Sequence, residues 1–180
     1  MGNSLLAVRG INHKYIVVVG GERCMVSLFR VDFRLLHFQT SQTWPKKLGC
    51  TMIIVANDEV VKDSLRMSLM KMSASGGIRL KICSVDEAAS YLLADESKNT
   101  KIELVVESPK DAYRICEKVT ALKELNVALL KGGEGKRMVS PSLSFSPEDE
   151  EYLKKMLDRG IKIESYVAPD DKKVSVEKYF

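Results

Sequence analysis

The sequence predicts a single α/β domain with a mostly parallel, open sheet and helices on both faces of the sheet. Two observations support this fold class. From Met25 onward, short apolar runs alternate with longer amphipathic stretches, and such regular alternation of strand and helix is typical of a parallel sheet. The chain has 180 residues, which suits one domain that is stable without a disulfide or a structural metal.

The first 24 residues fall outside this alternation. Ile16–Val19, followed by Gly20 and Gly21, has the pattern of an additional strand and a turn. Met25 lies one residue before the first strong apolar run. We therefore divide the chain into an N-terminal extension, residues 1–24, and a domain, residues 25–180.

Each predicted strand of the domain is a run of four to seven residues rich in β-branched side chains, as expected of strands buried on both faces. In chain order the runs are Val26–Val31, Met52–Ala56, Leu80–Cys83, Ile102–Val106, Val127–Leu130 and Ile161–Val167. Ligands of such sheets bind at the carboxyl ends of the strands. We therefore expect function in the loops that follow Val31, Ala56, Val106 and Leu130.

Between the strands lie residues that favour helix starts. Ser84 and Glu87 have the spacing of a capping box, in which the two side chains satisfy amides that the first turn leaves free. Ser108 and Ser146 each precede a proline and have an acid three residues later, which also favours a helix start. Gly160 is placed to end the last helix before the final strand.

One further helix is predicted after the second strand, beginning at Asn57–Glu59 and running to about Met72. Leu65, Leu69 and Met72 share one face of this helix, and the pattern predicts that this face packs in the core. Helix capping also explains Asp58 and Glu59 better than a role as phospho-acceptors.

Composition narrows the function classes. The net charge is only +4 and the basic residues are spread along the chain, which is not typical of a protein that binds nucleic acid. No apolar run approaches the roughly 20 residues of a membrane span, so we expect a cytoplasmic protein. The cysteines, Cys24, Cys50, Cys83 and Cys116, form no C-x-x-C pair, so we expect reduced thiols and neither a metal nor a cofactor.

A charged cluster follows the first strand of the domain. His37 lies in the same eight-residue stretch as Arg30, Asp32 and Arg34. A neutral imidazole can accept a phosphoryl group, arginine offsets the charge of that group, and an aspartate can orient the arginines or fix the histidine tautomer. A solvated polar loop has a similar composition, so this pattern alone leaves the function open.

A family resemblance adds to this reading. The run Arg30–Gln39, with Trp44 seven residues beyond His37, resembles the signature of IIB components of the mannose/fructose/sorbose/N-acetylgalactosamine-type sugar phosphotransferase system. The similarity covers about residues 25–170. It continues through Ile53–Val60, then Asn126-Val127, Gly135-Lys136 and Pro147–Glu150, in the order of the family.

The resemblance implies a phosphocarrier of sugar uptake, acting as a protein-phosphohistidine–sugar phosphotransferase. It implies that His37 is phosphorylated by a IIA phosphohistidine and passes the group to a sugar that membrane IIC and IID components deliver. Arg34, Arg30 and Asp32 are then the other catalytic residues. Contact with the membrane is expected through these components only, and no nucleic acid takes part.

Two positions depart from the family pattern, and a proline beyond them affects the helix that follows. Phe38 occupies the place of a usual glycine, and Phe33 the place of a common acid. Pro45 predicts that the helix after the loop starts late or is kinked. These features keep open the alternative of a catalytically weakened regulatory paralogue. A separate alternative is a phospho-aspartate receiver-like binding module that would use Asp58.

Two other candidates carry less weight. Lys131–Arg137 looks like a phosphate loop, but Leu130 and Arg137 stand where a Walker A motif needs Gly and Ser or Thr. We interpret this segment as a mobile turn near the active site. His13 has no charged cluster around it except Lys14, and we assign it no role.

Overall fold

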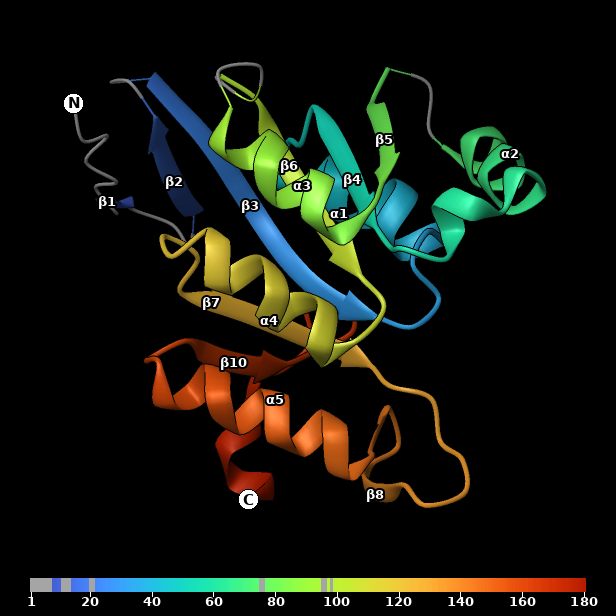
Figure 1. Ribbon diagram of the computed structural model, residues 1–180, viewed down its shortest axis with the longest axis vertical. Helices are drawn as coiled ribbons and strands as arrows, with labels where there is room; N and C mark the ends of the chain where they lie inside the picture. The colour runs from blue at the N-terminus through green and yellow to red at the C-terminus, as the bar shows by residue number, and fades with distance from the viewer. Residues whose placement is uncertain (1–7, 11–13, 20–21, 75–76, 95–96, 98) are drawn as a thin grey trace.

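The central element is a mixed sheet with helices on both faces (Figure 1). The computed structural model describes residues 8–10, 14–19, 22–74, 77–94, 97 and 99–180. The strand order is β11-β10-β7-β3-β6-β4-β5, and the pairings from β10 through to β5 are all parallel. The predicted fold class, a mostly parallel open sheet covered on both faces, is confirmed.

All six predicted strands are present. They are β3 (Glu22–Asp32), β4 (Met52–Ala56), β5 (Arg79–Cys83), β6 (Lys101–Val106), β7 (Glu124–Leu129) and β10 (Lys162–Ser165). Strand β7 starts three residues before the predicted Val127 and therefore includes Asn126. The short strand β11 (Val174–Ser175) pairs antiparallel with β10 at the edge.

The predicted extra strand near the N-terminus is also present. It is β2 (Lys14–Val19), which pairs antiparallel with the first part of β3, while β1 (Val8–Gly10) pairs with β2. The predicted turn at Gly20 and Gly21 lies outside the described residues. The pairing explains why β3 begins four residues before the predicted Val26.

Three helices cover one face of the sheet (Figure 1). They are α3 (Val85–Leu93), α4 (Pro109–Lys118) and α5 (Pro147–Asp158), and they pack on the larger apolar core. The predicted caps are confirmed, because Ser84, Ser108 and Ser146 each accept a hydrogen bond from the amide three residues later. Gly160 has φ 73°, as expected of a glycine that ends a helix.

The opposite face carries the loop after β3 and the helical segments that follow β3 and β4. A π-helical turn, η1 (Gln39–Thr43), leads into α1 (Trp44–Leu48), and η2 (Val60–Lys62) leads into α2 (Ser64–Ser73). The change from π to α geometry occurs directly before Pro45, which has no amide proton for a helical hydrogen bond. Leu35 and Leu36 of the loop share a second core cluster with Met70 of α2.

The prediction for the helix after β4 is wrong in two respects. Asn57 accepts hydrogen bonds from the amides of Glu59 and Val60 and starts only the short turn η2, whereas Asp63 caps α2. The face predicted to be core is exposed: Leu65, Leu69 and Met72 are 70%, 56% and 82% accessible.

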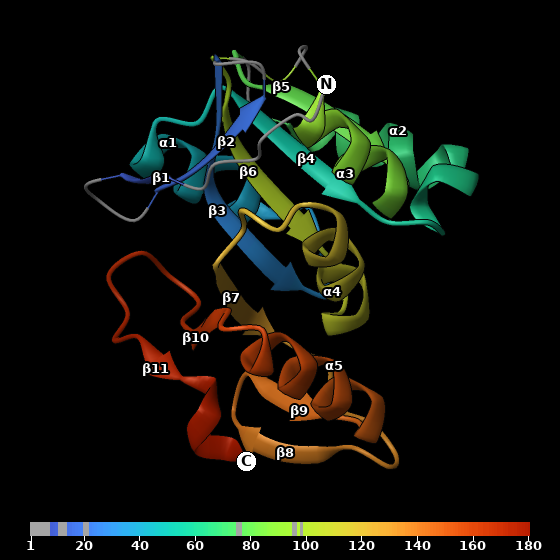
Figure 2. The same cartoon turned by 60° about the vertical axis from the view of Figure 1, so that its left-hand side comes forward.

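The remaining elements lie at the C-terminal side of the sheet. The hairpin of β8 (Arg137–Ser140) and β9 (Leu143–Phe145) precedes α5, and the chain ends in the 3-10 turn η4 (Val176–Tyr179). Figure 2 shows this hairpin beneath α5, far from α2. None of the described helices combines the length and the apolar character needed to cross a bilayer.

Candidate functional site

The site is built where the central strand β3 ends and its loop begins. β3 lies between β6 and β7, and Asp32 is its last residue. The loop then turns sharply, with Leu35 in the left-handed region (φ 55°) and fully buried. A non-glycine residue in this region is uncommon, and burial of the leucine holds the turn in this conformation.

Thr40 fixes the position of His37 in the loop. The backbone amide of His37 donates a hydrogen bond of 2.9 Å to Thr40 Oγ1. The Thr40 hydroxyl in turn donates to the carbonyl of Leu35 over 2.8 Å, and Thr40 itself is fully buried. One threonine therefore joins both sides of the turn and holds the histidine at the start of the following helix.

His37 is held through its side chain as well. Its Nε2 lies 2.8 Å from Oδ2 of Asp32. A carboxylate accepts hydrogen bonds and does not donate them, so in the neutral imidazole Nε2 carries the proton. The Nδ1 lone pair is then available for chemistry. The side chain is 15% accessible, so it reaches solvent at one edge.

Asp32 is the centre of a buried charge network. Its Oδ2 accepts hydrogen bonds from Arg30 Nε (3.3 Å) and Nη2 (3.0 Å) in addition to the one from His37. Its Oδ1 accepts the backbone amide of Arg34 over 3.1 Å. Burial alone would raise the pKa of Asp32, but the hydrogen bond from His37 and the charge of Arg30 outweigh burial and lower it.

Arg30 lies behind Asp32 and is fully buried. Its Nη1 donates to Asn126 Oδ1 (2.9 Å) and to the carbonyl of Val167 (3.1 Å), and its guanidinium lies 5.7 Å from the ring centroid of Trp44. Burial lowers its pKa, and the ion pair with Asp32 opposes that shift. With its donors directed at protein acceptors, Arg30 is a structural support for Asp32.

Arg34 occupies a different position from Arg30. Its side chain is 40% accessible, and its Nε lies 3.6 Å from Oδ1 of Asp32. The guanidinium is therefore at the solvent edge of the site, next to the carboxylate that holds His37. It is the cation of the cluster that an incoming anion can reach.

Phe38 follows His37 and is 73% accessible. Its backbone is right-handed helical (φ −50°, ψ −44°), a conformation open to any residue. The position therefore does not need the dihedral freedom of glycine, and the phenylalanine does not pack beneath the loop. Its ring stands in solvent beside the histidine.

Two buried polar residues of the site were not predicted from sequence. Asn126 on β7 joins Arg30 to the C-terminal segment, because its Nδ2 also donates to the carbonyl of Tyr166 over 2.9 Å. Glu103 on β6 is fully buried, and neither of its carboxyl oxygens has a hydrogen-bond partner among the described residues. Each is a polar residue inside an apolar run of the sequence, and this pattern was the signal that could have identified both residues.

The environment of Glu103 favours the neutral form of its carboxyl group. Burial raises its pKa well above the usual value, and the charge of Arg30 opposes this shift only in part. A buried carboxyl group whose neutral form is favoured therefore lies under the site, close enough to Arg30 and Asp32 to interact with both electrostatically.

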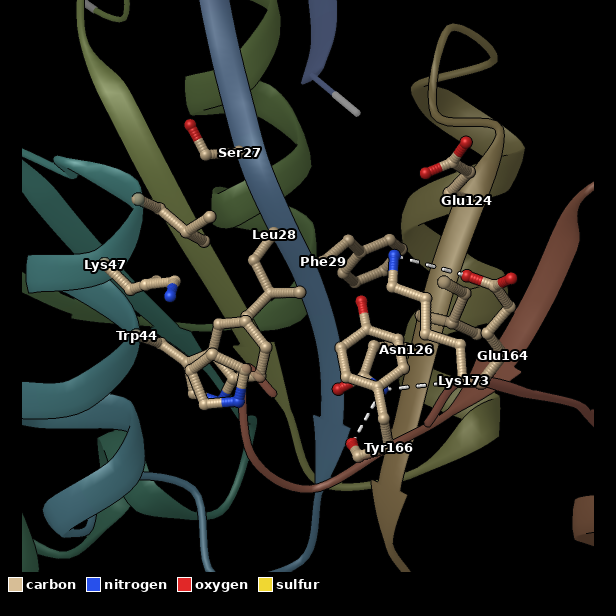
Figure 3. Close-up of a pocket in the computed structure, with 13 residues that line it drawn as sticks. Ser27, Leu28, Phe29, Trp44, Lys47, Glu124, Asn126, Glu164, Tyr166 and Lys173 are labelled. Carbon is tan, nitrogen blue, oxygen red and sulfur yellow. Dashed lines mark hydrogen bonds and ion pairs between the residues drawn. The ribbon is translucent and has the colours of Figure 1, made fainter. Parts of the chain in front are cut away.

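Asn126 and Trp44, which contact Arg30, also line a cavity of about 310 Å³. Figure 3 shows Trp44 and Lys47 on one side of this cavity and Tyr166 and Lys173 on the other, with Ser27 near the middle of β3. Trp44 Nε1 donates to the carbonyl of Val167 over 3.1 Å, the same carbonyl that Arg30 uses. The loop that carries Val167 is thus tied to both α1 and β3.

The other sequence candidates lie outside the network. Asp58 does act as a cap, but for α3, because it accepts the amide of Val85, and it is also paired with Arg114 at 2.6 Å. In the segment likened to a phosphate loop, Lys136 and Arg137 are paired with Asp149 and Glu150 of α5.

Two further expectations concern histidine and cysteine chemistry. His13 lies outside the described residues. Cys50, Cys83 and Cys116 are buried free thiols, and burial raises the pKa of Cys83 to about 11 and that of Cys116 to about 12. Within the described part of the chain, no group of three or more His, Cys, Asp or Glu side chains is arranged to hold a metal ion.

The comparisons with known proteins agree on one family. The family model of the sorbose subfamily IIB component of the PTS, the sugar phosphotransferase system, matches residues 26–180. A probable phosphotransferase enzyme IIB component of Streptococcus pyogenes serotype M6 is 32% identical over 138 residues, which is 74% of this chain and 85% of that protein. The mannose-specific EIIAB component of Escherichia coli K12 is 28% identical over 152 residues, 84% of this chain but only 47% of that longer protein.

Solved structures agree with the fold. The IIBSor domain of the sorbose permease from Klebsiella pneumoniae superposes with a TM-score of 0.81 at 23% identity, covering 85% of this chain and 94% of that one. The N-acetylgalactosamine-specific IIB component 1 from Escherichia coli gives a TM-score of 0.75 at 26% identity, covering 83% and 97%.

Proposed function

The chain belongs to the sorbose subfamily of IIB components of the sugar phosphotransferase system, and we propose that it carries the transferred phosphoryl group on His37. IIB components are phosphotransferases of sugar uptake, and the shared family makes this chain one of them. The observation that supports the proposal most strongly is the 2.8 Å hydrogen bond between His37 Nε2 and the buried carboxylate of Asp32.

Nδ1 of His37 is the proposed nucleophile. With the Nε2 proton donated to Asp32, the lone pair of the neutral ring is on Nδ1. That lone pair attacks the phosphorus of a donor phosphohistidine. The new P–N bond forms while the P–N bond of the donor breaks, and its electrons return to the donor imidazole. Asp32 stabilises the positive charge that the His37 ring gains in this step.

Arg34 is proposed to offset the charge of the phosphoryl group. Its guanidinium lies at the solvent edge of the site, and arginine presents several donors in one plane to phosphate oxygens. The helical segment that begins after His37 adds the positive end of its dipole at the same place. Transfer of a phosphoryl group depends mainly on position and electrostatics, which these residues provide.

Arg30, Asp32 and Asn126 are proposed to hold the histidine for this reaction. Asp32 orients the ring, Arg30 keeps Asp32 ionised and in place, and Asn126 fixes Arg30. Arg30 is fully buried, so its contribution is positioning and not contact with the phosphoryl group.

We propose that the donor is a IIA phosphohistidine and that the acceptor is a sugar held by membrane IIC and IID components. The mannose-specific relative from Escherichia coli is named as an EIIAB component. In this scheme the protein works at the cytoplasmic side of the membrane, as a protein-phosphohistidine–sugar phosphotransferase. Residues 25–180 form the working domain, and the family match over residues 26–180 supports this division.

The two alternatives have less support. A receiver-like module would need Asp58 as an acceptor, but that carboxylate caps α3 and is paired with Arg114. A weakened paralogue would not need a complete support for His37, yet the network from Asp32 through Arg30 to Asn126 is present.

The test uses the purified chain, a IIA donor system and phosphoenolpyruvate as the source of phosphoryl groups. We expect one acid-labile, alkali-stable phosphoryl group per chain, located on His37 by fragmentation of the intact peptide. His37→Gln, which keeps an amide in place of the ring, should accept none. Label on an aspartate, which alkali would remove, would contradict the proposal.

A further inference from the structure

Helix α2 is apolar on two opposite sides, and only one of them is covered. Met67 and Met70 pack against the second core cluster. Leu65, Leu69 and Met72 are spaced by four and three residues, so they form one stripe along the opposite side. An apolar face of a helix is expected to be covered by another apolar surface, and this second side of α2 is not.

The stripe is open to solvent. Leu65 is 70%, Leu69 56% and Met72 82% accessible. They account for three of the six large apolar side chains recorded as exposed among the described residues. Three such side chains on one short helix form a contiguous apolar surface, which in soluble proteins is typical of an interaction site.

Basic residues flank the stripe on both sides. At 100° per residue, Arg66 and Lys71 lie about a quarter to a third of a turn away from it, on opposite flanks. The helix itself contains no acid, and the nearest acid in the sequence is its cap, Asp63. An apolar stripe between two basic flanks is the pattern of a helix that lies on an anionic bilayer, with its long basic side chains reaching the headgroups.

The positive charge beside the stripe favours lipid over a membrane protein as its binding partner. Cytoplasmic loops of membrane proteins carry an excess of Lys and Arg, which would repel a basic surface. The cytoplasmic leaflet is anionic and attracts such a surface. We infer that the α2 stripe, Leu65, Leu69 and Met72, is a docking surface for anionic lipid, which brings the chain reversibly to the membrane.

The position of α2 is compatible with this role. It lies on the same face of the sheet as the loop that carries His37, and Figure 1 shows it as the outermost element beside β5. Three partly inserting side chains give weak binding, as one acyl chain also does, so the protein can leave the surface again. The inference does not depend on which residue is phosphorylated.

The experiment is co-sedimentation of the full chain with vesicles of phosphatidylglycerol and phosphatidylethanolamine, compared with phosphatidylcholine alone. We expect binding to the anionic vesicles, and a loss of at least about tenfold in affinity for the double variant Leu65→Glu/Leu69→Glu. Arg66→Gln and Lys71→Gln should each weaken binding by roughly fivefold and reduce its dependence on salt.

Met138→Glu is the matched control, because Met138 is 73% accessible but lies on β8, far from α2. It should bind vesicles as the wild type does. Unchanged urea midpoints would show that the α2 variants are folded. The inference would be overturned by wild-type chain that stays in the supernatant with anionic vesicles, or by equal binding of wild type and double variant. A dimer of the chain that the double variant abolishes, or binding only to membranes that contain a protein partner, would also overturn it.

Discussion

Replacing Asp32 by Asn tests how the buried network prepares His37. The substitution keeps the shape of the side chain but removes its charge. Arg30, fully buried, then loses its ion-pair partner, and the Nε2 proton of His37 has no ionised acceptor. Two separate consequences follow, one for stability and one for phosphoryl transfer.

The loss of stability comes from the unpaired arginine. Removing one partner of a buried ion pair typically costs about 3–5 kcal/mol, because the remaining charge stays desolvated. We expect the free energy of unfolding of Asp32→Asn to fall by about that amount. Urea titration followed by circular dichroism measures it.

The lower rate of phosphoryl transfer is expected from the effect on His37. An asparagine amide can also donate to Nε2, which would place the ring proton on Nδ1 and block the nucleophile. In a related arrangement, exchanging the aspartate that orients a catalytic histidine for asparagine lowers the rate about 10⁴-fold. We expect a fall of about 10²–10⁴ in the rate of phosphorylation by the IIA donor, measured by rapid quench.

A double variant separates the two effects. Arg30→Gln added to Asp32→Asn removes both buried charges, which is often close to neutral for stability. The double variant should regain most of the lost stability but not the lost rate. A single Asp32→Asn variant that transfers at the wild-type rate, with less than about 1 kcal/mol of lost stability, would refute the role assigned to this network.

The other predictions concern four further features. Arg34→Ala should lower the rate of phosphorylation by a factor of about 10²–10³. Arg34→Lys should lower it by less, because a lysine keeps the charge but not the planar donors. Equal rates for wild type and both variants would show that Arg34 takes no part in the reaction. Phe38→Gly should speed transfer from the donor, because it removes an exposed ring next to the proposed phospho-acceptor. A slower variant would show that the ring assists docking. Glu103 has a folded-state pKa above its unfolded value, so its ionisation favours unfolding as pH rises from about 4.5 toward the folded value. Glu103→Gln should therefore be more stable than wild type at pH 8 and should lose this advantage near pH 4.5, as urea midpoints at the two pH values will show; a constant difference would contradict a raised pKa. Removal of residues 1–24 should leave a folded, phosphorylatable domain, although it also removes Glu22–Cys24 of β3; a truncated chain without a cooperative unfolding transition would show that β2 is integral.

The elements of the fold were predictable because their signals are local. The apolar run Met52–Ala56 matches β4 residue for residue, and Ser84 with Glu87 forms the capping box that its spacing indicates. Helix α2 was predicted wrongly for a physical reason. An apolar stripe indicates that a face is covered by something, and the sequence does not distinguish the core of the same chain from an external surface.

The site was predictable only in part. The four charged residues after the first strand are close in sequence, so their proximity in space was expected. The opposite roles of the two arginines were not, because the burial of Arg30 depends on Asn126 and Val167, which are 96 and 137 residues away. Contacts of this range are set by strand order, and the order β7-β3-β6 cannot be read from any single segment.

The central claim is that Nδ1 of His37 carries the phosphoryl group. The direct measurement is ¹H–¹⁵N and ³¹P NMR of the chain after phosphorylation by its IIA donor, with ¹⁵N-labelled histidine. We predict phosphorus coupling to Nδ1 of His37 while Nε2 keeps its proton, and no phosphorus signal from a His37→Gln sample. Coupling to Nε2, or a phosphoryl group on another residue, would contradict it.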